Sequence, residues 1–273
     1  MKRRILTGLP LALVVVYLLV QGREWLFTLA VLATVLISLQ EYFHISREAG
    51  LGGWPRMGYV AAVLLCLGQL ADLHGMVFGE SSLLLLLVLA IPVAGLVIVS
   101  DLKNYSGALA STVLGVFYVG FAFSWMIPLR FGDPVAGWRL IVLLFLVVWA
   151  GDIFAYAVGR MVGRIPLARK ISPKKTVEGA IAGLAGGVLV AWGFSHWFWQ
   201  TGDQKTVILI GGLVALAGQA GDLVESALKR AANLKDSGAI LPGHGGLLDR
   251  IDSLLFAAPT LWLAWRLKDF WHW

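Results

Sequence analysis

The sequence predicts an all-α fold, a polytopic bundle of transmembrane helices. Hydrophobic residues make up 59% of the 273 positions and the mean hydropathy is +0.81, both above the values usual for soluble domains. The apolar runs approach the roughly 20 residues that a helix needs to cross a bilayer. They lack strand-like alternation, which argues against a membrane barrel. Because a helix satisfies its own backbone in hydrocarbon, a helical bundle follows.

About nine spans are expected, each placed by an apolar run. The first is interpreted as a retained helix, because no small-x-small cleavage site precedes Gln21. Cys66, the only cysteine, lies in the third run, so no intrachain disulfide can form. In chain order the expected spans are 5–20, 25–40, 57–74, 83–99, 107–129, 138–159, 177–199, 206–228 and 252–270.

The basic residues predict a cytoplasmic N-terminus. With nine spans in that orientation, sixteen of the 22 lysines and arginines fall on the cytoplasmic side, as the positive-inside rule requires. Ten of the sixteen lie in two clusters, 160–175 and 229–250. The need to orient the protein in the membrane does not explain this clustering. Anionic lipid headgroups or a phosphorylated soluble substrate are the expected partners of these clusters.

The charged residues that could serve a reaction are distributed unevenly along the chain. Residues 1–145 are expected to supply packing helices and a dimer surface, and 146–273 the catalytic helices with their cytoplasmic loops. Nine of the 38 charged residues fall between positions 222 and 252. In the N-terminal part, Glu41 ends the second span and is expected to snorkel to the interface.

Two aspartates predict a metal site. Asp222 lies in the eighth span, where a charge is costly unless it is paired or functional, and its own helix offers no basic partner three or four residues on. Asp249 begins the last span, across a glycine-rich loop. Together they would offer hard oxygen ligands, for which Mg²⁺ fits best. Asp252 is expected to pair with Arg250 or a neighbouring helix.

The loop between these aspartates predicts a phosphate cradle. Its glycines allow the backbone to approach an oxyanion and present N–H groups to it. A glycine-rich turn alone is a weak signal, but here basic residues flank it. The glycines are Gly238, Gly243, Gly245 and Gly246, and the basic residues are Lys229, Arg230, Lys235 and Arg250.

Two further segments carry candidate residues. In 169–187, Ser172 is expected to cap a helix that begins at Pro173, with Lys174 and Lys175 in its first turn, an arrangement that attracts anions. The alternative is a loop that only sets topology. In 149–160, Asp152 and Tyr156 lie one turn apart within a span; a metal, a substrate or a buried hydrogen bond would each explain Asp152.

These residues together resemble the phosphatidate cytidylyltransferase (CDP-diacylglycerol synthase) family. Its C-terminal signature can be written S-x-x-K-R-x4-K-D-x-G-x2-L-P-x-H-G-G-x-x-D-R-x-D. Every specified place is filled, by Ser226, Lys229, Arg230, Lys235, Asp236, Gly238, Leu241, Pro242, His244, Gly245, Gly246, Asp249, Arg250 and Asp252. Two upstream elements are also similar, S-P-x-K-T-x-E-G at 172–179 and D-x-x-A-Y at 152–156.

The resemblance implies that CTP and phosphatidic acid give CDP-diacylglycerol and pyrophosphate, with Mg²⁺ required and K⁺ as a candidate second ion. It also implies a homodimer; no nucleic acid is expected as a partner. The implied metal ligands are Asp222 and Asp249. The expected catalytic residues are Asp222, Asp249, Lys229, Arg230 and His244. The expected substrate-binding residues are Asp152, Tyr156, Ser172, Lys174, Lys175, Thr176, Ser226, Lys235, Asp236, Gly245, Gly246 and Arg250.

We expect the protein in a bacterial cytoplasmic membrane with its site facing the cytoplasm. Two other functions make different demands on the sequence. A CTP-dependent polyprenol or phytol kinase would activate a neutral hydroxyl and release CDP, and the complete signature argues against it. A cation-coupled transporter would line a path across the bilayer with acids, whereas the basic clusters here fall on one side.

Overall fold

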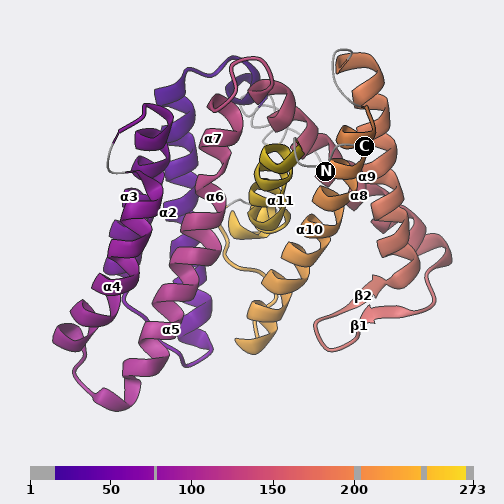
Figure 1. The fold of residues 1–273 in the computed structure, drawn as a ribbon. Coiled ribbons are helices and arrows are strands. Elements are labelled where there is room, and N and C mark those ends of the chain that lie inside the picture. Colours follow the sequence, from indigo (N-terminus) through magenta and orange to yellow (C-terminus); the bar gives the residue numbers. More distant parts are fainter. Residues whose placement is uncertain (1–15, 77–78, 200–203, 241–244, 269–273) are drawn as a thin grey trace. The chain divides into compact units, whose positions relative to one another are not determined.

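The computed structural model of the chain describes residues 16–76, 79–199, 204–240 and 245–268, which are almost entirely helical. They form two compact units within the fold of Figure 1. The first unit takes its residues from Met1–Gly132 and Leu228–Ile251, and the second from Asp133–Ala227 and Asp252–Trp273. The expected division between packing helices (1–145) and catalytic helices (146–273) was based on where the charged motifs fall. These compact units do not test it, and it stays a prediction.

The helices of the first unit follow the apolar runs. A turn separates α2 from α3, and its residues Gly50, Gly52 and Gly53 have positive φ angles that residues with a Cβ rarely adopt. Pro55 then begins α3, where its missing N–H costs nothing. The elements are α2 (Glu24–Glu48), α3 (Pro55–Leu73), α4 (Glu80–Ile98), η1 (Leu102–Asn104), α5 (Tyr105–Gly115), η2 (Val116–Phe121), α6 (Ala122–Ser124) and α7 (Met126–Phe131).

A hydrophobic core holds α3 and α4 against η2. Its buried members are Ala61, Leu65, Leu87, Ile91 and Val116. Element η2 is a π-helical stretch inside the helical run Leu102–Phe131, a form that usually occurs as a short bulge within an α-helix. α3 packs against both α2 and α4, as their neighbouring indigo and magenta ribbons show (Figure 1).

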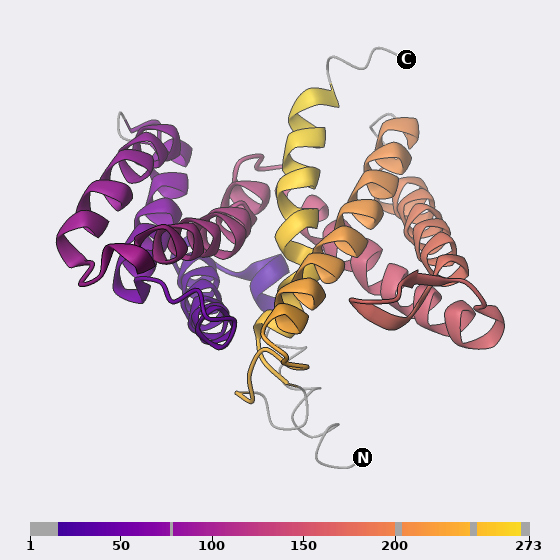
Figure 2. The same ribbon diagram turned by 90° about the horizontal axis from the view of Figure 1, so that it is seen from below.

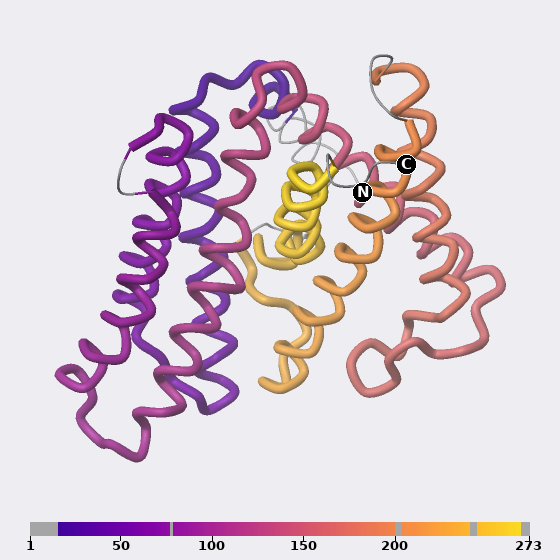
Figure 3. Tube along the Cα trace, viewed as in Figure 1, coloured from indigo at the N-terminus to yellow at the C-terminus, as the bar shows by residue number. Residues whose placement is uncertain are grey.

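The second unit combines long helices with one small hairpin. α8 (Gly137–Val162) leads into strands β1 (Pro166–Ala168) and β2 (Ser172–Thr176), which are followed by α9 (Val177–Phe198). α10 (Gln204–Ala231) and α11 (Leu248–Leu267) each begin in one unit and end in the other. In the tube of Figure 3, the orange helix is α10 and the yellow helix is α11.

The hairpin corrects one expectation. Residues 172–176 do not form the first turn of a helix capped by Ser172; they form β2, paired antiparallel with β1. The Val177 N–H donates to the Ile165 carbonyl at 2.8 Å, which continues the pairing. α9 therefore begins only at Val177, and Thr176 is its cap, because its Oγ1 accepts from the Gly179 N–H at 3.1 Å.

Small residues bring α8 and α9 together along a close seam, visible in Figure 2 as adjacent helices. A Cβ built on Gly183 would lie 2.9 Å from the Gly151 carbonyl oxygen, and one on Gly179 would lie 2.7 Å from the Ala155 carbonyl oxygen. Side chains at these places would push the backbones apart. Glycine seams of this kind are common between transmembrane helices, where close van der Waals packing drives association.

Seven helical segments of the described chain are long and apolar enough to cross a membrane. The result confirms a helical membrane protein. The first expected span lies largely outside the described residues, and α11 is a helix but is not among the seven. The spans are Glu24–Glu48, Pro55–Leu73, Glu80–Ile98, Leu102–Phe131, Gly137–Val162, Val177–Phe198 and Gln204–Ala231.

Candidate functional site

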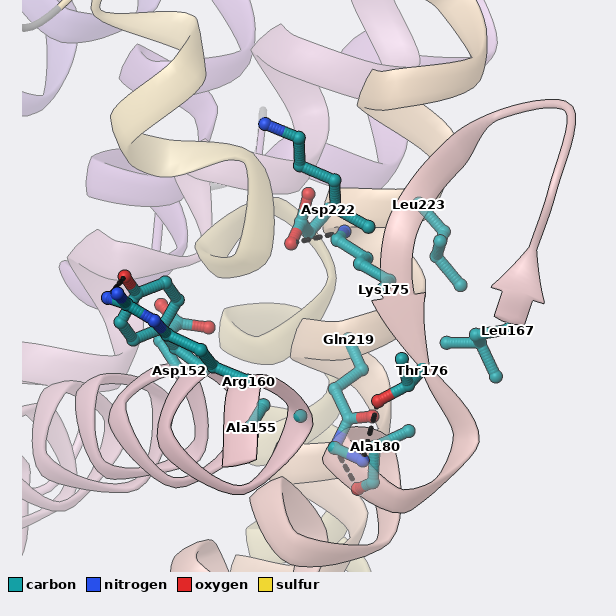
Figure 4. Close-up of a pocket in the computed structure, with 14 residues that line it drawn as sticks. Asp152, Ala155, Arg160, Leu167, Lys175, Thr176, Ala180, Gln219, Asp222 and Leu223 are labelled. Carbon is teal, nitrogen blue, oxygen red and sulfur yellow. Dashed lines mark hydrogen bonds and ion pairs between the residues drawn. The ribbon is translucent and has the colours of Figure 1, made fainter. Parts of the chain in front are cut away.

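A cavity of about 620 Å³ lies in the second unit (Figure 4). α8, the hairpin, α9 and α10 all contribute to its wall. Six of the expected site residues line it: Asp152, Tyr156, Lys174, Lys175, Thr176 and Asp222. Ser172, also expected, is on β2 but outside this lining.

An ion pair crosses the cavity wall between β2 and α10. Lys175 Nζ lies 2.5 Å from Asp222 Oδ2, and each side chain is about 30% exposed, at 30% and 29%. Figure 4 shows the two side chains pointing toward each other. The Ser226 hydroxyl donates to Asp222 Oδ1 at 3.4 Å. The basic partner that α10 does not supply to Asp222 therefore comes from the hairpin.

One face of α8 supplies the opposite wall. Asp152, Tyr156 and Arg160 follow one another at intervals of four residues, so they share a helix face, and all three line the cavity. Arg160 Nη1 donates to the Tyr156 hydroxyl at 3.0 Å. Two carboxylates on different helices, Asp152 and Asp222, thus line one cavity together with basic side chains.

Two of the polar lining residues, Arg160 and Gln219, were not among the predicted site residues. Arg160 belongs to the basic cluster 160–175 but was not among the expected site residues, although its spacing from Tyr156 places it on the same helix face. Gln219 lies one turn before Asp222 on α10, and its amide donates to the Ala180 carbonyl at 3.1 Å. This bond ties α10 to α9 beside the cavity.

A second charged cluster lies in the first unit, around Asp249. Lys229 Nζ is 2.6 Å from Asp249 Oδ1, and the two side chains are only 12% and 9% exposed. The backbone N–H groups of Ser237 and Gly246 donate to Asp249 Oδ2 at 3.0 and 2.8 Å. Asp249 therefore accepts hydrogen bonds from both sides of the loop that precedes it.

Four N–H groups, from the described ends of the glycine-rich loop and the start of α11, donate to the chain's own carboxylates. Ser237 and Gly246 donate to Asp249, while Leu247 and Leu248 donate to Glu41 on α2. Gly245 has a φ of +78°, and a Cβ there would lie 2.8 Å from Asp249 Oδ2. The close approach expected at Gly238, Gly245 and Gly246 is thus an approach to Glu41 and Asp249, while Gly243 lies outside the described residues.

The snorkelling expected for Glu41 was wrong. Its side chain is 4% exposed, and its carboxylate accepts the Leu247 and Leu248 N–H groups and the Ser237 hydroxyl. Burial is favourable because a carboxylate at a helix N-terminus meets unpaired N–H groups and the positive end of the dipole. The missed signal was an acid inside an apolar run.

The remaining expected residues lie between the end of α10 and the first turn of α11. Arg230 Nη1 donates to the Leu234 carbonyl at 2.7 Å beyond the end of α10. Lys235, Asp236 and Arg250 are exposed. His244 lies outside the described residues.

The donor chemistry of the cavity fits a hard cation. Mg²⁺ needs only one or two protein carboxylates when it keeps water and substrate phosphates, and Asp152 and Asp222 offer two. Within the described ranges, no group of three or more His, Cys, Asp or Glu side chains could hold a metal ion. Asp222 and Asp249 belong to different units, so their pairing at one ion stays a prediction.

Fold and cavity define a helical integral membrane protein with a charged cavity among its helices. Residues 2–267 match the Cytidylyltransferase family. The chain therefore belongs to that family, which confirms the resemblance found in its motifs.

Similar proteins carry a more specific name. The chain is 35% identical over 272 residues to the phosphatidate cytidylyltransferase of Bacillus subtilis (strain 168), which covers 96% of each chain. It is 34% identical over 272 residues to that of a Synechocystis species, covering 87% of each chain. It is 36% identical over 282 residues to that of Brucella abortus biovar 1, covering 96% of this chain and 92% of the relative.

Proposed function

We propose that this protein transfers the cytidylyl group of CTP to phosphatidic acid, giving CDP-diacylglycerol and pyrophosphate. The observation that carries the proposal is the cavity among transmembrane helices where Asp152, Asp222 and Lys175 meet. A membrane protein with a charged cavity suits a reaction between a lipid phosphate and a soluble nucleotide. The names of the relatives point to the same reaction.

The reaction forms one bond and breaks one. A phosphate oxygen of phosphatidic acid attacks the α-phosphorus of CTP, and the bond from that phosphorus to the pyrophosphate oxygen breaks. The attacking phosphate monoester is already anionic near pH 7, since its second pKa is about 6, so no strong general base is needed. The obstacle is the meeting of two polyanions.

The basic residues of the cavity address that obstacle. Lys174, Lys175 and Arg160 line it, and their charges would neutralise the phosphates of CTP and the departing pyrophosphate. Tyr156 would hold Arg160 in place through the hydrogen bond at its hydroxyl. Lys229, Arg230, Lys235, Arg250 and His244 are proposed as further phosphate-binding groups.

We also propose that Asp222 and Asp249, with Asp152, hold the divalent ion. Mg²⁺ would supply charge neutralisation on the phosphates and bring the leaving group into line. Asp222 is suited to this because it is partly exposed and its contacts with the Lys175 ammonium and the Ser226 hydroxyl involve groups that phosphates could engage in turn. Potassium as a second ion belongs to the same proposal.

The membrane setting is proposed as well. About nine spans with a cytoplasmic N-terminus would bring both basic clusters to the cytoplasmic face, where CTP is found. We further propose that the protein lies in a bacterial inner membrane and forms a homodimer. Cysteine-accessibility labelling of single-cysteine variants at Lys170 and Lys205 would test it, because nine spans put these residues on opposite sides.

The function itself is tested by one assay on the purified protein in detergent with Mg²⁺. CTP alone should give no pyrophosphate, and CTP with phosphatidic acid should give pyrophosphate and CDP-diacylglycerol in equal amounts. Release of CDP when a polyprenol or phytol is supplied would point to the kinase instead. Failure to release pyrophosphate with phosphatidic acid would overturn the proposal.

A further inference from the structure

Glu41 is a buried acid that the proposed reaction does not use. It lies on α2, in the part of the chain where the sequence shows only packing helices. Its two oxygens accept three hydrogen bonds: Ser237 Oγ at 2.9 Å, Leu248 N at 2.7 Å and Leu247 N at 3.0 Å. All three donors come from the loop between α10 and α11 or from the start of α11.

Two glycines of the family signature close around the same carboxylate. A Cβ on Gly238 would lie 2.6 Å from Glu41 Oε1, and one on Gly246 would overlap both Glu41 Oε2 and the Ser237 hydroxyl. Any side chain at these positions would push the loop away from Glu41. Glycine is therefore required at positions 238 and 246 because the Glu41 carboxylate lies too close to leave room for a side chain.

The loop connects Glu41 to Asp249 through shared residues. Ser237 donates its hydroxyl to Glu41 and its backbone N–H to Asp249. At the other end of the loop, Gly246 N donates to Asp249, and the next two N–H groups donate to Glu41. The loop is thus held between two carboxylates, one from α2 and one from α11.

We propose that Glu41 is a positioning residue for cytidylyl transfer. Its carboxylate fixes residues 237–238 and 246–248, so that Asp249 keeps the orientation in which Lys229 contacts it. This inference rests on the proposed function and extends it to the N-terminal helices. These helices then hold residues 237–238 and 246–248 in the conformation that the reaction needs, in addition to packing.

The test compares Glu41→Gln with Glu41→Asp. Glutamine keeps the size of the side chain but turns an amide NH₂ toward backbone donors, whereas aspartate keeps the carboxylate and loses one methylene. If Glu41 positions the loop through its charge, E41Q should lower kcat roughly ten- to a hundredfold, and E41D should lower it less. If Glu41 only fills space, the order reverses. Glu48→Gln, on the exposed end of the same helix, is the matched control and should keep wild-type kcat.

Hydrogen exchange of the folded proteins in detergent gives a readout independent of activity. E41Q should speed exchange at the Leu247 and Leu248 amides while leaving those of α3 unchanged, and E48Q should change neither. Wild-type kcat and wild-type protection in E41Q would overturn the proposal. A wild type that releases no pyrophosphate would instead refute the proposed function and leave the exchange result standing.

Ser237→Ala is the second variant if E41Q does not fold. It removes one of the three bonds to Glu41 and keeps the Ser237 N–H on Asp249. We expect a severalfold loss of kcat with faster exchange at the loop amides. Unchanged kcat and unchanged exchange in S237A would overturn the positioning role.

Discussion

The ammonium of Lys175 lies 2.5 Å from the carboxylate of Asp222, and this ion pair joins the β2 strand to α10 at the wall of the cavity. Both side chains remain about one-third exposed to it. Water and a ligand can therefore reach the pair, which limits its contribution to stability. A triphosphate that entered would offer Lys175 an anion and leave Asp222 available to a cation.

Asp222→Asn should lower the rate of pyrophosphate release by about a hundredfold or more, because the amide cannot hold a cation as a carboxylate does. The protein should stay folded, since the side chain is partly exposed and has about the same size. Turnover is measured with saturating CTP and phosphatidic acid, and folding by size-exclusion chromatography in detergent. Near wild-type turnover with Mg²⁺ as the only divalent ion would show that Asp222 is not the metal ligand.

Asp249→Asn should abolish turnover and also destabilise the protein. Asp249 is only 9% exposed and accepts from Lys229, Ser237 and Gly246, so the variant removes the carboxylate that the largely buried Lys229 ammonium contacts. We expect a loss of about 1–3 kcal/mol in the free energy of unfolding. The midpoint of thermal unfolding in detergent should fall for D249N and stay near wild type for D222N. Equal midpoints for the two variants would contradict this account.

The helices could be predicted from the sequence because the signal is local. An apolar run of sufficient length forms a helix in hydrocarbon whatever its neighbours are, so α2, α8 and α9 appear near their expected positions. The start of α9 was placed too early because Ser172–Thr176 pairs with Pro166–Ala168, and that pairing competes with a helix. A proline and a serine that would suit a helix start here begin a strand.

The sequence predicts candidate site residues more readily than it predicts their contacts. The motifs led to Asp152, Lys175 and Asp222, and the cavity brings these three together. The partner of Asp222 was missed because Lys175 comes from a hairpin distant in sequence. Glu41 was misread for the same reason: its donors lie near the other end of the chain, and a single acid in an apolar run does not reveal them.

Gly183→Val should destabilise the second unit. The first side-chain carbon would come within 2.9 Å of the Gly151 carbonyl oxygen and 3.1 Å of the Ala155 Cβ, so α8 and α9 would have to separate. Overpacking of this kind costs about 1–3 kcal/mol. Gly212→Val on α10 is the control, since a Cβ there meets only Val188, at 3.4 Å. Thermal unfolding in detergent should show a lower midpoint for G183V than for G212V, and equal midpoints would contradict the close seam.

Arg160→Ala should raise the KM for CTP about tenfold with a smaller change in kcat. Arg160 lines the cavity and is steadied by the Tyr156 hydroxyl at 3.0 Å, so a phosphate would meet a guanidinium already in place. Losing one charge-assisted hydrogen bond costs about 1.5–3 kcal/mol, and about 1.4 kcal/mol corresponds to tenfold in affinity. Arg169→Ala, at the exposed hairpin turn and outside the cavity lining, removes the same charge and should leave the KM unchanged. Pyrophosphate release measured against CTP concentration at fixed phosphatidic acid gives both constants. An equal rise of KM in the two variants would mean that net positive charge, rather than a contact made by Arg160 in the cavity, attracts the nucleotide.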